Sequence, residues 1–111
     1  MNDELVTMQD RLVKTHARMR ERLRKENDPA ARRAILNEMT EVMVRVQIVG
    51  SLLFAKQSLE LERKTGAVKG ATAKVHKAID SLKDLRELLD TVSSFLALVD
   101  EAIDFAKLAI L

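Results

Sequence analysis

The sequence contains no cysteine, tryptophan or tyrosine, and it has one proline and three glycines in 111 residues. The absence of cysteine excludes disulfides, thiolate zinc sites and cysteine nucleophiles, and it fits a cytoplasmic protein. Aromatic residues make up 3% of the chain. This composition disfavours all-β folds, because they need many turn residues and many β-branched or aromatic strand residues. The abundance of Ala, Leu, Glu, Lys and Arg predicts helices instead.

A long uncharged apolar run is also missing. The most apolar stretch, residues 42–55, is too short to span a bilayer and contains Arg45. The N-terminal residues 1–4 include two acids and are not a secretory signal. The net charge of +2 gives no general reason to expect a polyanionic partner. We therefore expect one cytoplasmic domain, residues 1–111, without a membrane partner.

Two helices are predicted in the first 64 residues. The first covers about residues 3–26 and ends before Asp28-Pro29, a good N-cap followed by a proline suited to the first helical position. The second covers about residues 29–64 and is apolar on nearly every face between residues 42 and 55, which predicts contacts on several sides. Gly50 within it predicts close approach of another backbone. The first helix has a narrow apolar stripe, typical of a coiled-coil seam: Leu5, Met8, Leu12, Met19 and Leu23, with Thr15 filling the gap between Leu12 and Met19.

The third predicted helix covers about residues 68–110, after a turn within residues 64–70 that contains Gly66 and Gly70. Its apolar residues recur at steps of four and three, which indicates one supercoiled helix of about 40 residues. The sequence leaves open whether this helix is kinked at its one local weak point, Thr91–Ser94. The stripe consists of Ala71, Val75, Ala78, Leu82, Leu85, Leu89, Val92, Leu96, Val99, Ile103, Ala106 and Ile110.

The predicted fold is all-α, because short turns make these successive helices antiparallel. It is an elongated antiparallel three-helix bundle with long, coiled-coil-like helices. The first helix is too short to cover the other two, so the hairpin of the second and third helices is predicted to project beyond it over about residues 56–82. In this arrangement the end of the first helix lies beside the end of the third.

The functional prediction is based on apolar surface that a three-helix bundle would leave exposed. Three helices cannot bury all the apolar faces of the second and third helices, and exposed apolar patches usually mark interfaces. We predict a non-enzymatic protein–protein interaction or assembly module that self-associates through these two helices. A symmetric dimer is favoured, while a tetramer and an unidentified protein partner stay open. The predicted interface residues are Val44, Ile48, Leu52, Leu98 and Phe105.

A basic segment supports an alternative, because nine basic and three acidic residues lie between Arg11 and Arg33. It could bind the phosphates of a nucleic acid. Charge matching inside the bundle is the favoured interpretation, since six acids and two bases follow from Asp84 onward. No aromatic residues interleave with the bases, which argues against single-strand binding. The candidate contact residues are Arg18, Arg22, Lys25, Arg32 and Arg33.

Signals for catalysis, metals and cofactors are missing. The Glu-x-x-His pairs of di-iron bundles and the His-Glu-x-x-His zinc motif are absent. No glycine-rich phosphate loop is present, and no acid occupies a predicted seam position where burial would tune its pKa. The sequence therefore predicts no enzyme, no metal and no cofactor.

Overall fold

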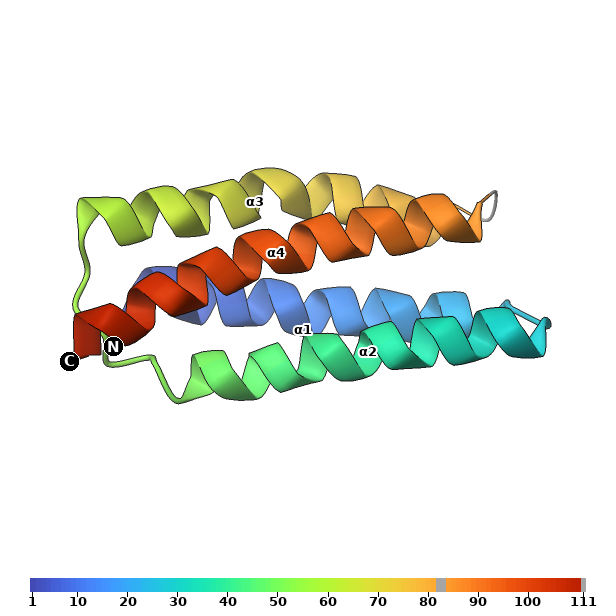
Figure 1. The fold of residues 1–111 in the computed structure, drawn as a ribbon, viewed down its shortest axis with the longest axis horizontal. Helices are drawn as coiled ribbons and strands as arrows, with labels where there is room; N and C mark the ends of the chain where they lie inside the picture. The colour runs from blue at the N-terminus through green and yellow to red at the C-terminus, as the bar shows by residue number, and fades with distance from the viewer. Residues whose placement is uncertain (82–83, 111) are drawn as a thin grey trace.

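A computed structural model describes residues 1–81 and 84–110 of the chain. These residues form a bundle with extents of 45 × 21 × 16 Å (Figure 1). The prediction of an all-helical chain is confirmed, whereas the prediction of three helices is wrong. The described residues contain four helices: α1 (Asp3–Arg24), α2 (Pro29–Gly50), α3 (Leu59–Asp80) and α4 (Leu85–Ile110).

The four helices form two antiparallel hairpins, α1–α2 and α3–α4, that pack side by side (Figure 1). α1 packs against α2 and α3, and α4 packs against α3 and α2, while in the described residues no Cα atoms of helices across a diagonal come within 8 Å of each other. The loop of residues 51–58 crosses one end of the bundle to join α2 to α3. The chain therefore forms a four-helix bundle in which α1 and α3 are parallel neighbours, as are α2 and α4.

Polar contacts fix the parallel register of α1 and α3. In three of them, the partner in α3 follows the α1 residue by 61 or 62 positions. A constant offset of this kind requires two parallel helices that stay level along their length. α3 is thus packed against α1 and α4, and the predicted projection of residues 56–82 is wrong. The three pairs are Glu4–Thr65, Thr15–His76 and Arg18–Asp80, at 3.3, 2.9 and 2.6 Å.

The first hairpin begins largely as predicted. The predicted stripe of α1 is buried from Leu5 to Met19, although Arg22 rather than Leu23 occupies the last buried position. The N-cap of α2 is also confirmed, because the Asp28 carboxylate accepts from the backbone N–H of Ala31 at 2.9 Å. Local capping chemistry thus determined this boundary.

The predicted second helix is too long, because α2 ends at Gly50. Leu52 and Ala55 remain buried beyond it, but they belong to the loop of residues 51–58. The side chain and backbone of Asn2 hold this loop, donating to Ala55 O at 3.1 Å and to Leu53 O at 2.7 Å. The apolar run misled the prediction because burial continues where the helix does not.

The predicted third helix is two helices. α3 starts at the N-cap Ser58 and includes Gly66 and Gly70 in its interior, so the predicted turn at residues 64–70 is wrong. α3 ends where Ser81 adopts an extended conformation, and α4 begins behind Asp84, whose carboxylate accepts from Arg86 N at 2.9 Å. Steps of three and four cannot distinguish one helix from two helices joined by a turn. Leu82, a member of the predicted stripe, lies outside the described residues.

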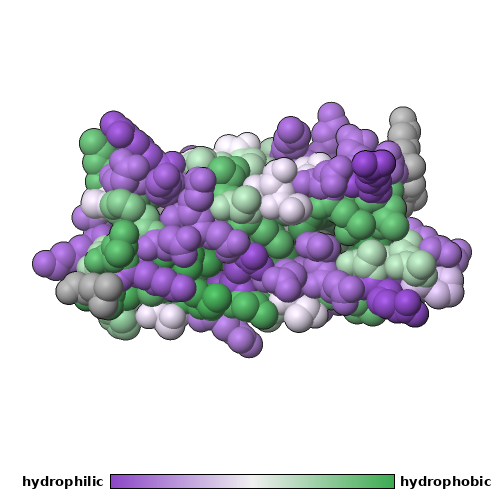
Figure 2. All heavy atoms as spheres, viewed as in Figure 1, coloured by the Kyte–Doolittle hydropathy of each residue, from purple (hydrophilic) through white to green (hydrophobic). Residues whose placement is uncertain are grey.

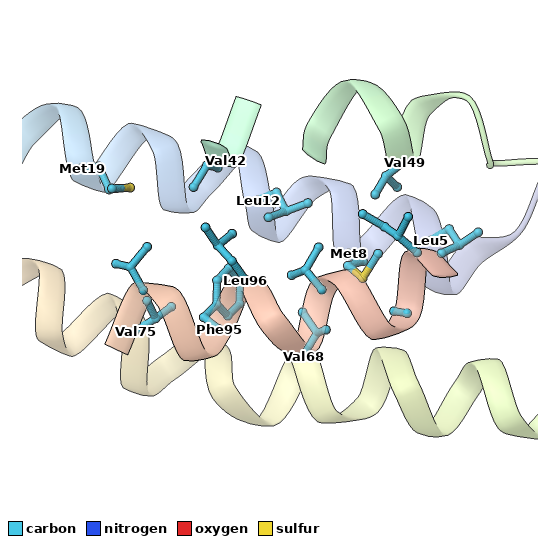
Figure 3. Close-up of a cluster of buried hydrophobic side chains, with 14 of the residues drawn as sticks. Leu5, Met8, Leu12, Met19, Val42, Val49, Val68, Val75, Phe95 and Leu96 are labelled. Carbon is cyan, nitrogen blue, oxygen red and sulfur yellow. The ribbon is translucent and has the colours of Figure 1, made fainter. Parts of the chain in front are cut away.

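The hydrophobic core runs along the axis of the bundle, and all four helices contribute to it (Figure 3). α4 is continuous across Thr91–Ser94 and buries a wide face that includes Phe95 and Leu96. On the α2–α4 side, Arg45 is bound to Asp100 by two hydrogen bonds of 2.8 and 2.9 Å, and also to Glu41 at 2.9 Å. This bidentate ion pair joins the two hairpins at the level of the core.

Candidate interaction surface

The five predicted interface residues do not share one surface. Leu52 is buried in the loop of residues 51–58, and Ile48 is half-buried against the core. Val44 is 43% exposed on α2. Leu98 and Phe105 are half-buried on α4. Val44 and Ile48 thus belong to α2 and Leu52 to the loop, whereas Leu98 and Phe105 belong to α4.

The candidate basic contacts are largely used within the chain. Arg18 pairs with Asp80 at 2.6 Å, and Arg32 donates to Leu23 O at the end of α1, also at 2.6 Å. Arg22 is 5% exposed and hydrogen-bonds to the backbone at the end of α3. Lys25 and Arg33 are exposed. These residues therefore act mainly on helix ends. The predicted pairing of helix 1 with the acids after Asp84 is wrong, because in the described residues no ion pair joins α1 to α4 and Arg18 pairs with Asp80 of α3 instead.

A groove runs between α3 and α4 on the outer side of the second hairpin. Two adjoining hollows of about 300 and 260 Å³ share Lys74 and Thr91 as lining residues. Its floor is apolar and contains small residues of α3, which leave room above the larger core residues of α4. Apolar surface is visible in Figure 2 between ridges of charged side chains. The floor consists of Ala71, Ala78, Leu88, Phe95 and Leu98.

The two rims of the groove carry opposite charges. Lys74 and Lys77 stand on the α3 rim, and Asp84, Glu87 and Asp90 stand on the α4 rim. Asp84 caps α4, but the other four form no ion pair with any residue in the described part of the chain. The groove thus presents an apolar floor between a basic edge and an acidic edge.

Two glycines lie on the exposed side of α3. A Cβ at Gly66 or Gly70 would meet no atom within 4 Å, although each glycine costs a helix interior about 1 kcal/mol relative to Ala. Gly50 differs, because a Cβ there would lie 3.1 Å from Gln9 Nε2, so a side chain rather than the predicted backbone makes the close approach. The packing of this chain therefore gives no reason for glycine at positions 66 and 70.

A second apolar feature is the end of the bundle that holds both chain termini (Figure 1). The sequence does not reveal this feature, because it arises only when the loop of residues 51–58, the start of α3 and the end of α4 lie at the same end of the bundle. Phe54, in that loop, is 84% exposed. We call this group the apolar end: Met1, Phe54, Leu59, Leu108 and Ile110.

Burial shifts the pKa values of two histidines and one glutamate. Burial, followed by Arg20, lowers the pKa of His16, and burial, followed by Arg18, lowers that of His76. Burial, followed by Glu41, raises the pKa of Glu38. Within residues 1–81 and 84–110, no three His, Asp or Glu side chains gather in a way that could hold a metal ion.

Among the described helices, none combines the length and apolar character needed to cross a membrane. Comparisons of this chain with protein-family models, with curated proteins and with solved structures found no match. A function for this chain is therefore inferred from the surfaces of the bundle itself.

Proposed function

We propose that this chain is a non-enzymatic protein–protein interaction module that assembles with a second copy of itself through the α3–α4 groove. The observation that supports this proposal is the apolar floor between rims of opposite charge. Such a surface is complementary to itself, as the interface of a two-fold dimer must be. Its proposed place of action is the cytoplasm, on the basis of the cysteine-free composition.

This proposal keeps only part of the predicted interface. Leu98 lines the groove, and Phe105 lies two helical turns further along α4. Leu52 is buried, while Val44 and Ile48 belong to α2. Nucleic-acid binding receives less support, because Arg18, Arg22 and Arg32 are hydrogen-bonded within the bundle.

The test is the mass in solution of the full chain, measured by light scattering on a sizing column. The wild type is expected at twice the chain mass of 12.5 kDa. Gly70→Arg is expected to be monomeric, because position 70 lies one helical turn before Lys74 of the basic rim, where a long side chain would oppose close approach of a second copy. The substitution favours the helix by about 1 kcal/mol, so loss of the dimer would not result from unfolding.

Two variants serve as controls. Ala73→Arg places the same side chain at an exposed position of α3 that turns toward α1 rather than α4, and Val44→Glu places a charge on α2. Both are expected to remain dimeric, with unchanged circular dichroism. A monomeric wild type, or a Gly70→Arg chain that dimerises as well as the wild type, would show that the proposal is wrong.

A further inference from the structure

The positions of the charged residues along the α3–α4 groove indicate how a second copy would be oriented. Lys64 Nζ lies 4.0 Å from Glu101 Oε2, which sets the register of these antiparallel helices. Ten residues onward in α3 and ten residues back in α4, Lys74 and Thr91 line the same hollow. The basic rim at Lys74 and Lys77 is therefore level with the acidic rim at Glu87 and Asp90, near one end of the groove.

Two orientations of a two-fold dimer can be compared on this basis. An axis parallel to the helices places α3 of each copy on α4 of the other, at the same level. Lys74 then faces Asp90 of the partner subunit, and Lys77 faces Glu87 of the partner subunit. An axis across the helices places α3 on α3, so the lysines face lysines and the acids face acids. Like charges in contact oppose that arrangement.

Gly70 of α3 supports the same orientation. By the register above, Leu98 of α4 is level with Ala67, which precedes Gly70 in α3 by three residues, about one helical turn. An axis parallel to the helices brings Leu98 of the partner subunit over these small residues. The space above Gly70 is open, and small residues let two helices approach closely. Close packing at this point would account for glycine in a helix interior.

We propose that two copies pair about a two-fold axis parallel to the helices, with α3 of each copy on α4 of the other. This inference depends on the proposed self-assembly through the same groove. It makes the dimer parallel: both apolar ends, and all four chain termini, lie at one end of the assembly. At the opposite end, α1 and α3 of both copies end and α2 and α4 begin.

Cross-linking of the full chain tests the orientation, because the protein has no native cysteine. Two single variants, Lys77→Cys and Glu87→Cys, are mixed and treated with a short bis-maleimide. The expected product is a mixed dimer joining position 77 to position 87, with little linkage of 77 to 77. As a matched control, Ala73→Cys mixed with Glu87→Cys is expected to give little product, because position 73 turns toward α1.

The outcomes separate the two proposals. A dimer by light scattering that links 77 to 77, rather than 77 to 87, would overturn the parallel orientation and leave self-assembly through the groove in place. A dimer that links neither pair would likewise overturn the orientation. A monomer by light scattering would contradict the proposed function itself, and the orientation with it.

Discussion

The guanidinium of Arg22, on α1, lies 3.1 Å from the carbonyl oxygen of Ile79 in the last turn of α3. The same Nη1 atom donates to the carbonyl of Ser81, just beyond the helix. The last carbonyls of a helix have no donor within the helix, and a cation at the C-terminus also interacts favourably with the helix dipole. Arg22 therefore supplies α3 with a C-terminal cap from a neighbouring helix.

Replacing Arg22 with Ala should destabilise the fold strongly. The variant removes the Arg22 donor from the carbonyl of Ile79, a fully buried residue, at an expected cost of about 2–3 kcal/mol in the free energy of unfolding. Urea unfolding followed by circular dichroism measures the change. Arg20→Ala, at an exposed position two residues earlier, should change it by less than about 0.5 kcal/mol. Equal effects of the two substitutions would contradict the capping role.

Asn2 should control the loop of residues 51–58. Its side chain accepts from Leu5 N at 3.1 Å and donates to Ala55 O at 3.1 Å. Asn2→Ala removes both bonds, with an expected loss of about 1–2 kcal/mol. Limited trypsin digestion should then cut faster after Lys56, while Asp3→Ala should digest like the wild type. Unchanged cleavage in Asn2→Ala would mean that other contacts hold the loop.

The glycines should respond differently to alanine. Gly66→Ala is expected to raise the free energy of unfolding by about 1 kcal/mol, because the added methyl group meets no atom and alanine favours the helix. Gly50→Ala should gain less, because its Cβ would lie 3.1 Å from Gln9 Nε2, which donates to Val46 O. Thermal unfolding of the two variants, compared with the wild type at one protein concentration, measures the difference. A larger gain at position 50 would contradict this account.

Stability should fall on mild acidification. Burial lowers the pKa of His16 and His76 below the ordinary value of 6.5; Arg20 lowers that of His16 further, while His76 is also lowered by Arg18 and Lys14 and raised by Asp80. Between 6.5 and the lower folded pKa values, the unfolded chain binds more protons than the folded chain. The free energy of unfolding therefore decreases as the pH falls through this window and levels off below it.

Urea unfolding at several pH values between about 7.5 and 5 measures this dependence. The double variant His16→Gln/His76→Gln should show a flatter profile over the same interval. If its profile matches that of the wild type, other groups account for the pH dependence.

The sequence predicted those parts of the fold that depend on local chemistry. Asp28-Pro29 marked a boundary because an N-cap and a proline act within one helical turn. The stripe of α1 was also correctly predicted. Asp84, with Glu87 three residues later, is a comparable start signal for α4, but the regular apolar spacing across it suggested one helix. The end of α2 at Gly50 could not be predicted from the apolar pattern, because Leu52 and Ala55 stay buried in the loop that follows.

The candidate surface could not be predicted from the sequence, because its two rims belong to helices that were interpreted as one. Lys74 and Glu87 become neighbours across a groove only when the chain reverses between α3 and α4. The role of Arg22 was missed for a related reason: the carbonyls it binds belong to a helix end that the apolar spacing did not indicate. Leu98 was selected for its apolar character, which is a local property.

The apolar end gives the bundle a direction. One pole exposes Phe54 and both termini. At the other pole lie exposed Lys25, just after α1, Arg33 near the start of α2, and Arg86 in the first turn of α4. If the molecule bound a surface through its apolar pole, the charged pole would face away from that surface. Protein fused to either terminus would stand at the apolar pole, so labels placed in the turn after α1 would be better suited to experiments that must leave Phe54 accessible.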